Sequence, residues 1–277
     1  MPATQAEKGA RFKALHQGPG AFVIPNPFDI GTARILTALG FKALATTSAG
    51  FAFTLGRRDG AVARHEAISH AAIIVGATEL PVSADLENGF GDAPEAAALT
   101  VTLAGTSGLA GCSIEDASGD AAKPIYDKSL AVERIAASVE AARKLPYPFM
   151  LTARAENFLH GRPDLDDTIA RLRAFADAGA DVLYAPGLPD LAAIRTVCSA
   201  VSKPVNVLMG NRGRSFPVSE LAAAGVRRIS LGSGLSRVAL GAVIKAAREI
   251  NETGTFGVCE DGASFAELSR FMLGKQN

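Results

Sequence analysis

The sequence predicts an α/β fold, a (β/α)8 TIM barrel that forms one domain over residues 1–277 and carries an extra C-terminal helical segment. Three observations support this prediction. Helix-like stretches that end in glycine are repeatedly followed by short apolar runs. These runs lack strict alternation, as expected for parallel strands that are buried on both faces. Eight such units in 277 residues give about 35 residues each, which is the size of a barrel unit.

The predicted strands and helices alternate along the whole chain. The strands span residues 21–25, 41–46, 81–85, 111–115, 149–153, 181–185, 203–208 and 227–231. Helical stretches lie at 30–39, 64–77, 94–104, 130–143, 165–178, 190–199, 219–224 and 236–250. A doubly wound open sheet shows the same alternation and is the alternative fold. No Gly-x-Gly-x-x-Gly motif follows the first strand, which disfavours a dinucleotide-binding version of that sheet.

Composition and charge exclude several classes of function. The 28 acidic and 28 basic residues balance, so the chain lacks the basic field that nucleic-acid binding requires. No apolar run approaches the ~18–20 residues that cross a bilayer, which predicts no membrane partner. Residues 1–13 show no secretory signal, and the three cysteines are widely spaced, as is typical of a reducing compartment. We therefore expect a cytoplasmic protein.

Carboxylates follow two neighbouring predicted strands, and barrel enzymes gather their chemistry at such strand ends. Asp85 and Glu87 end the third strand, and Glu115 and Asp116 end the fourth. Unpaired, these groups would repel one another, and a hard divalent cation such as Mg²⁺ or Mn²⁺ resolves the conflict. The alternative is that each carboxylate caps the helix that follows it. We interpret Asp85, Glu87 and Glu115 together as a metal site.

Further polar residues at the strand ends suggest an anion site. The planar fork of Arg154 suits a carboxylate, although an ion pair with Glu156 or with the acidic cluster is an equally good interpretation. The small residues 48–50 follow the second strand, either as a tight turn or as a turn whose backbone N–H groups approach an anion. Asn206 lies on the seventh strand and is a candidate substrate-binding residue. Three of the histidines, His65, His70 and His160, are expected on helix or loop surfaces.

The segments around these residues resemble the isocitrate lyase / phosphoenolpyruvate mutase superfamily up to about residue 250. The resemblance rests on the order and spacing of IPNPFDIGTARILTALGFKALATTSAG at 24–50, LGRRDG at 55–60, SADLENGFGD at 83–92, GCSIEDASGD at 111–120, LTARAENFL at 151–159 and KPVNVL at 203–208. It implies a (β/α)8 barrel, Mg²⁺ and a 2-oxo-carboxylate substrate. It also implies a homotetramer, a dimer of dimers in which subunits exchange the last barrel helix.

The resemblance also implies roles for individual residues. Ser48, Ala49 and Gly50 would bind the substrate carboxylate together with Arg154. Asp59 matches an aspartate beside the reacting group, and Asp85 would hold the metal directly or through water. Glu87 and Glu115 would complete the metal shell through water molecules, and we include Asp59, Glu115 and Arg154 among the candidate catalytic residues.

Two departures from the family pattern bear on the reaction, one in the loop after the fourth strand and one at the end of the sixth strand. Isocitrate and methylisocitrate lyases carry an acid–base cysteine in the loop after the fourth strand, whereas here that loop reads DASGDAAKPIYDK at 116–128. Cys112 lies inside the preceding strand and cannot replace that cysteine. Phosphonate-processing members use a lysine with an asparagine or threonine, and here only Lys123 and Ser118 are comparable. The sixth-strand glutamate of the lyases is also missing, since Ala185 stands there.

The sequence therefore predicts a Mg²⁺-dependent carbon–carbon lyase for a small 2-oxo or 2-hydroxy (di)carboxylate, including decarboxylation, rather than a true isocitrate or methylisocitrate lyase. A phosphonomutase-type enzyme and a non-catalytic 2-oxo-acid binding protein are the alternatives. Two further expectations concern segments outside the barrel. Residues 117–128 would form a mobile lid. Phe265, Leu268 and Met272 would form an apolar stripe that is covered by a neighbouring subunit or by the chain's own barrel.

Overall fold

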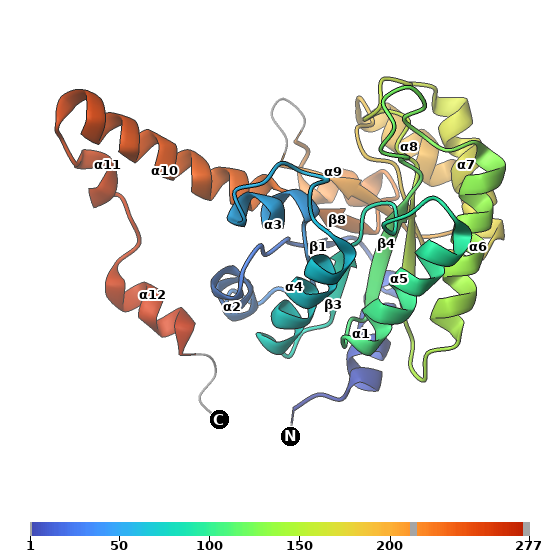
Figure 1. The fold of residues 1–277 in the computed structure, drawn as a ribbon, viewed down its shortest axis with the longest axis horizontal. Helices are drawn as coiled ribbons and strands as arrows, with labels where there is room; N and C mark the ends of the chain where they lie inside the picture. The colour runs from blue at the N-terminus through green and yellow to red at the C-terminus, as the bar shows by residue number, and fades with distance from the viewer. Residues whose placement is uncertain (1, 211–214, 274–277) are drawn as a thin grey trace.

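A computed structural model describes residues 2–210 and 215–273 (Figure 1). Eight parallel strands lie in the order β1-β8-β7-β6-β5-β4-β3-β2. They are β1 (Phe22–Ile24), β2 (Leu44–Ala45), β3 (Val82–Asp85), β4 (Gly111–Glu115), β5 (Met150–Arg154), β6 (Val182–Tyr184), β7 (Val205–Leu208) and β8 (Arg228–Ser230). Each predicted strand is present, and the nearly closed barrel confirms the predicted fold class.

The barrel closes between β1 and β2 through single contacts rather than a ladder. The Ala45 N–H donates to the Pro25 carbonyl at 3.0 Å. Just after β1, the Asn26 side chain donates to the Thr46 carbonyl at 2.9 Å and accepts from the backbone N–H groups of Leu231 and Gly232. One buried amide therefore ties β1 to both of its neighbours at the C-terminal end of the barrel.

The helices between the strands match the predicted ones within a few residues. They are α2 (Ile30–Ala38), α4 (Arg64–Gly76), α5 (Pro94–Thr106), α6 (Lys128–Arg143), α7 (Leu165–Asp177), α8 (Leu191–Ala200), α9 (Val218–Ala223) and α10 (Gly234–Thr253). Several begin at an aspartate whose carboxylate accepts from the helix backbone; Asp29, Asp164 and Asp190 do so for α2, α7 and α8. Such N-caps each contribute about 1 kcal/mol to helix stability.

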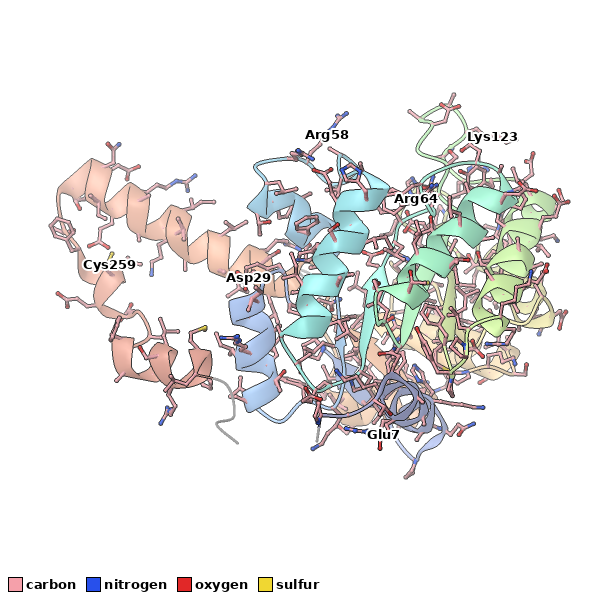
Figure 2. The ribbon with its side chains drawn as sticks, turned by 60° about the horizontal axis from the view of Figure 1, so that its bottom comes forward. Glu7, Asp29, Arg58, Arg64, Lys123 and Cys259 are labelled. Carbon is pink, nitrogen blue, oxygen red and sulfur yellow. The ribbon has the colours of Figure 1, made fainter. Side chains whose placement is uncertain are left out.

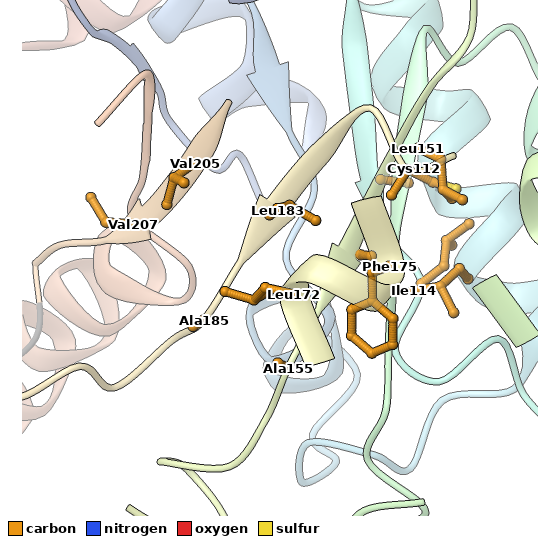
Figure 3. Close-up of a cluster of buried hydrophobic side chains, with 14 of the residues drawn as sticks. Cys112, Ile114, Leu151, Ala155, Leu172, Phe175, Leu183, Ala185, Val205 and Val207 are labelled. Atoms are coloured by element: carbon orange, nitrogen blue, oxygen red, sulfur yellow. The ribbon is translucent and has the colours of Figure 1, made fainter. Parts of the chain in front are cut away.

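The main hydrophobic core lies between the strands and the helices outside them (Figure 3). Ile114 and Leu151, which lie on β4 and β5, are fully buried against apolar side chains of the outer layer such as Phe175 on α7. Burying a side chain of this size contributes roughly 1.5–3 kcal/mol. This packing fixes the strand ends and hence the position of the site.

An additional helix, α1 (Gln5–Gln17), closes the N-terminal end of the barrel and was not predicted. Thr4 and Glu7 form a capping box at its start. Phe12 is fully buried in a second cluster with residues that begin the strands, including Met150 and Val182. Gly9 lets the helix approach the barrel, because a Cβ there would lie 2.3 Å from the Pro148 carbonyl oxygen.

The C-terminal segment extends away from the barrel (Figure 1). Helix α10 projects outward with Val238, Val243 and Ile244 exposed on its surface. Beyond it, α11 (Gly257–Glu260) and α12 (Phe265–Met272) return toward α2, where Arg34 donates to the Met272 carbonyl at 2.6 Å. The predicted extra helical segment is therefore present, whereas exchange of a helix between subunits stays a prediction. Within the described residues, none of the helices combines the length and apolar character needed to cross a membrane.

Candidate active site

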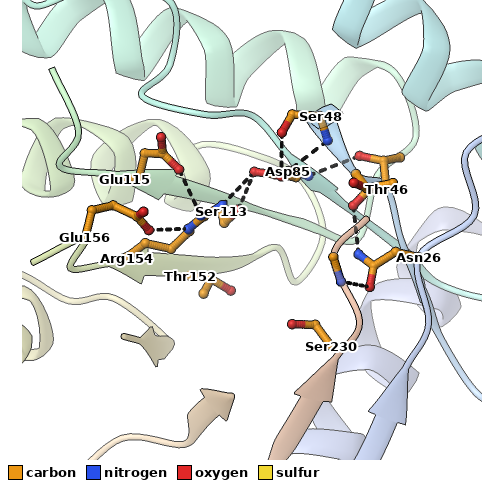
Figure 4. A network of polar contacts seen from close by, with 12 residues as sticks. Asn26, Thr46, Ser48, Asp85, Ser113, Glu115, Thr152, Arg154, Glu156 and Ser230 are labelled. Carbon is orange, nitrogen blue, oxygen red and sulfur yellow. Dashed lines mark hydrogen bonds and ion pairs between the residues drawn. The ribbon is translucent and has the colours of Figure 1, made fainter. Parts of the chain in front are cut away.

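Polar side chains from β3, β4 and β5 converge at the C-terminal end of the barrel (Figure 4). The strand register pairs Asp85 with Ser113 and Glu115 with Arg154, so these residues lie side by side. Arg154 donates to Asp85 at 2.8 Å and lies 3.1 Å from a Glu115 oxygen. Its Nε atom donates to Glu156 at 2.9 Å. The ion-pair interpretation of Arg154 therefore describes this structure, and its role as a substrate clamp stays a prediction.

The carboxylates around Arg154 outnumber the cation that they share. Burial, and then the neighbouring charges of Glu156 and Asp85, raise the pKa of Glu115 well above its ordinary value. Burial is also the main reason that the pKa of Glu156 is raised. One guanidinium cannot balance three carboxylates, so this end of the barrel has an excess of negative charge.

Asp116, the fourth predicted carboxylate, belongs to a separate network. It is buried, pairs with Arg171 at 3.0 Å and accepts from the Glu156 backbone N–H at 2.8 Å. Arg171 also pairs with Asp167 at 2.8 Å. This network anchors the segment after β5, so Asp116 holds the site together rather than lining it.

Ser48 begins a helix, whereas a turn, either plain or anion-binding, was expected at residues 48–50. Helix α3 (Ser48–Thr54) follows β2, and both the backbone N–H and the hydroxyl of Ser48 donate to Asp85, at 3.3 and 3.0 Å. The Gly50 N–H donates to the Thr47 hydroxyl at 3.2 Å. A Cβ at Gly50 would lie 2.4 Å from a Thr47 methyl carbon, so only glycine fits there. Carboxylate binding by Ser48, Ala49 and Gly50 stays a prediction.

Glu87 and Asp59 lie beside Asp85 and complete the predicted set of acidic residues. Glu87 has a φ of 50°, a conformation that is uncommon for a residue with a side chain and that recurs at functional sites. Burial, together with the charges of Asp85 and Asp59, raises the pKa of Glu87 to about 7. Desolvation and then the charge of Asp85 raise the pKa of Asp59, which lies in the turn after α3.

The chemistry of these donors fits a divalent cation. In the described part of the chain, no three His, Cys, Asp or Glu side chains come together in an arrangement that could hold a metal ion. Mg²⁺, however, keeps several water ligands and is commonly bound through one or two carboxylates. Asp85 could bind such an ion directly, with Glu87 and Glu115 acting through water. Burial is the main cause of the raised pKa values of Glu87 and Glu115, and neighbouring carboxylates add to it; a cation bound here would favour the charged form of both groups.

The loop after β4 keeps its polar groups occupied within the loop or against the barrel. Lys123 forms an ion pair with Asp127 at 2.5 Å, and both side chains are largely exposed. The Ser118 hydroxyl donates to the Lys123 carbonyl at 2.5 Å. Tyr126 donates to Asp92 at 2.7 Å, and burial raises its pKa to about 12. Figure 2 shows Lys123 on the outer part of this loop, at the same end of the molecule as Arg58.

Two other side chains, Cys112 and His70, were predicted to take no part in the chemistry of the site. Cys112 is fully buried within β4, and burial raises the pKa of its thiol, in agreement with its exclusion as an acid–base group. His70, expected at the surface, is instead buried and stacks on Phe51 with the rings 3.9 Å apart. Its ring nitrogen lies 3.0 Å from the Phe28 carbonyl. His70, on α4, therefore packs against α3 through Phe51.

A second polar layer lies inside the barrel below Asp85 and Arg154. Asn206 is buried, donates to the Ser230 hydroxyl at 3.0 Å and accepts from Arg228 Nε at 2.8 Å. Asn206, Arg228, Ser230 and Tyr184 line a cavity of about 50 Å³ that extends up to Asp85 and Arg154. Arg228 was not predicted from the sequence. The available signal was an arginine in a strand that the fold buries on both faces.

Proteins similar to this chain include lyases that act on small carboxylates and a putative lyase/mutase. The chain belongs to the phosphoenolpyruvate phosphomutase family, whose sequence profile matches residues 12–251, and thus to the isocitrate lyase / phosphoenolpyruvate mutase superfamily. This confirms the resemblance seen in the sequence.

Three relatives show the range of this superfamily. A putative lyase/mutase from Burkholderia cenocepacia superposes with a TM-score of 0.96 at 55% identity, over 98% of this chain and 97% of the other. A probable 2-methylisocitrate lyase from Corynebacterium glutamicum is 30% identical, over 90% of this chain and 82% of the relative. Oxaloacetate decarboxylase 2 from Pseudomonas fluorescens is 29% identical, over 89% and 84%.

Proposed function

We propose that this protein is a Mg²⁺-dependent carbon–carbon lyase that acts on a small 2-oxo or 2-hydroxy dicarboxylate, with decarboxylation of an oxaloacetate-like acid as the simplest reaction. The observation that carries this proposal is that Lys123 and Tyr126, in the loop after β4, already have partners. Lys123 is paired with Asp127 at the surface, and Tyr126 is held by Asp92 with a raised pKa. A reaction that needs no proton donor from this loop suits the site best.

The choice of reaction follows from where charge develops. Cleavage of isocitrate leaves a succinate-type carbanion that must be protonated by a positioned acid, and such help is typically worth ~10²–10⁴ in rate. Decarboxylation of a 2-oxo diacid instead releases CO₂ and an enolate, which water can protonate later. The proposed reaction therefore does not require the cysteine that is absent from residues 116–128.

Some of these side chains would bind the metal, and others would bind the substrate. Asp85 would hold the ion with Glu87 and Glu115, and the ion, when bound, would stabilise negative charge on the enolate oxygen. Arg154 would orient the substrate carboxylate with the backbone of residues 48–50. Asp59 lies close enough to Asp85 to be influenced by its charge and would face the reacting group. Asn206, within the barrel cavity, would contact the substrate from below.

A phosphonomutase-type reaction is the second candidate, and the family profile favours it. Phosphoryl transfer relies on cations that surround the transferred group. Here the cation of the loop would have to leave Asp127, and Ser118 would have to leave the Lys123 carbonyl. A non-catalytic protein that binds 2-oxo acids is the third candidate.

We also infer the cellular setting and the assembly. The three cysteines are unpaired, which is consistent with a reducing cytoplasm. The exposed apolar residues of α10, such as Val238 and Val243, are consistent with a homo-oligomer that is a dimer of dimers. Light scattering of the ligand-free protein tests this assembly.

Steady-state assays with Mg²⁺ or Mn²⁺ test the proposed reaction. The panel contains oxaloacetate, a 2-methyl-substituted malate, isocitrate, methylisocitrate and phosphonopyruvate. We expect turnover of at least one 2-oxo or 2-hydroxy diacid and none of isocitrate or methylisocitrate. Isocitrate turnover above ~1 s⁻¹, an ordinary enzymatic rate, would contradict the reasoning from the loop. Turnover of phosphonopyruvate alone would favour the mutase, and binding without any turnover would favour the third candidate.

A further inference from the structure

We propose that Arg228, inside the barrel, determines substrate specificity by binding the second, distal carboxylate of a dicarboxylate. The inference rests on the proposed function, because it assigns a subsite to that substrate. Arg228 is neither one of the residues predicted from the sequence nor part of the predicted metal site.

The strand register places Arg228 in the interior of the barrel. Arg154 pairs with Tyr184, Tyr184 with Asn206, and Asn206 with Arg228 across four neighbouring strands. Residues paired in this way point to the same face of the sheet. The Arg228 side chain extends across the interior, since its Nη2 atom donates to the Thr152 hydroxyl on β5 at 3.0 Å.

Arg228 is a buried cation with neutral partners. Its side chain is 5% exposed, and its described hydrogen bonds go to the Asn206 amide and the Thr152 hydroxyl. Its Nη1 atom is buried and has no hydrogen-bond partner among the described residues. Arg171, another buried arginine, shows the contrast, because two aspartates compensate its charge.

An uncompensated buried charge is costly, and buried polar groups normally have partners. Burial, and to a smaller extent the charge of Arg154, lowers the pKa of Arg228 to about 10, far above neutral pH, so the guanidinium remains charged. An anion bound at Nη1 would supply both the missing hydrogen bond and the missing charge. The local cost to the free protein thus becomes a source of affinity for a negatively charged group.

Arg228 lines a cavity that leads up to Asp85; its Nη1 atom is enclosed in the free protein and would turn toward that space to contact an anion. Arg228 and Arg154 are the two cationic side chains that line it, and its volume of about 50 Å³ suits a carboxylate group or a few water molecules. Arg154 is already engaged by Asp85, Glu115 and Glu156 at the upper end. Arg228 therefore offers a donor that has no partner among the described residues.

The spacing between Arg154 and Thr152, the residue that Arg228 contacts on β5, suits a short diacid. Thr152, which Arg228 contacts, precedes Arg154 by two residues on β5, which corresponds to about 7 Å along a strand. A substrate held at the strand ends by one carboxylate could reach downward through a four-carbon chain. Its second carboxylate would then lie near Arg228 Nη1, with Ser230 and Asn206 beside it.

Calorimetric titration in the presence of Mg²⁺ tests this subsite with three probes. Oxalate fills the upper site alone, malate carries a distal carboxylate, and 2-hydroxybutanoate is the same four-carbon acid with a methyl group instead. We expect the wild type to prefer malate over 2-hydroxybutanoate. Arg228→Met should weaken malate binding by about 10- to 150-fold, the range for a hydrogen bond to a charged group, and change the other two by less than about twofold.

Two further variants control for charge and folding. Arg227→Met removes the neighbouring arginine, which binds the carbonyls of Gly18 and Gly20, and should leave all three affinities unchanged. Arg228→Lys keeps the charge and should retain part of the preference for malate. We expect Arg228→Met to fold, because an apolar side chain of similar volume replaces an uncompensated buried charge.

A crystal structure of the wild-type protein with Mg²⁺ and malate tests the subsite without any variant. The distal carboxylate should lie within about 3.2 Å of Arg228 Nη1. Water alone at that atom, or equal loss of all three ligands in Arg228→Met, would overturn the subsite. Failure of the proposed function has a different signature, in which malate binding depends on Arg228 although no acid of the panel is turned over.

Discussion

Replacing Glu87 by glutamine should stabilise the metal-free protein at neutral pH. The substitution keeps the shape of the side chain and the φ of 50°, so it removes the charge and leaves the backbone strain in place. The pKa of Glu87 rises from an ordinary 4.5 to about 7, mainly through burial. Because a unit of pKa corresponds to about 1.4 kcal/mol, full ionisation would oppose folding by about 3.4 kcal/mol. Glu87 is only partly buried, so we expect solvent screening to leave about 1–2 kcal/mol.

The sign of the effect defines the pH window. A carboxyl whose pKa is raised in the folded state favours folding below its unfolded pKa of about 4.5, and this contribution disappears as the pH rises through about 7. The difference in unfolding free energy between Glu87→Gln and the wild type should therefore be near zero at pH 4.5. It should grow to about 1–2 kcal/mol in favour of the variant by pH 8.

Urea unfolding followed by circular dichroism, from pH 4.5 to 8 in the presence of a chelator, measures this difference. Glu133→Gln is the control, since it removes a carboxylate from the exposed surface of α6 and should change stability by less than about 0.5 kcal/mol. Added Mg²⁺ should then stabilise the wild type more than Glu87→Gln. A variant that is no more stable than the wild type at pH 8 would refute the electrostatic description of the site.

Three other outcomes follow from the same structure. Asp85→Ala should abolish Mg²⁺-dependent binding of oxalate, whereas Asp166→Asn, on the exposed side of α7, should leave it intact; unchanged calorimetric Mg²⁺ affinity in Asp85→Ala would exclude Asp85 as a ligand. Val238→Asp with Val243→Asp should reduce the assembly on light scattering, because both valines are exposed on α10; a wild-type protein that is monomeric, or an unchanged assembly in the variant, would count against an interface there. The loop at 117–128 should change position or order when Mg²⁺ and oxalate bind, and identical loops in crystals with and without ligand would argue against gating.

The sequence predicted the strands well because their burial on both faces gives short apolar runs that are separated by helices. It failed for α1, whose isolated buried residues, such as Phe12, carry little periodic signal within a polar stretch. It also failed for α3, because serine, alanine and glycine at its start are equally common in turns. In both cases the deciding contacts are made with distant parts of the chain.

The sequence predicted which residues make up most of the candidate site, but only partly how those residues contact one another. Strand-end positions identified Asp85, Glu115 and Arg154, which the structure brings together. Choosing between a substrate clamp and an ion pair required the distances around Arg154. Arg227 and Arg228 are adjacent in sequence, and only the strand register shows that the second of them faces the barrel interior. An apolar run without alternation cannot identify the inward-facing residues.

The contacts of Arg154 connect metal binding to substrate binding. In the free protein this arginine is shared by Asp85, Glu115 and Glu156, so its donors are occupied by the carboxylates that a cation would use. A cation at Asp85 would compete with the Arg154 Nη1 atom for the same oxygen atoms and release that donor toward a ligand. Binding free energies are coupled reciprocally, so a substrate carboxylate that draws Arg154 away would strengthen metal binding by the same factor. The ion pairs of the free site are therefore compatible with a catalytic arginine, because they hold it at the strand ends until both ligands arrive.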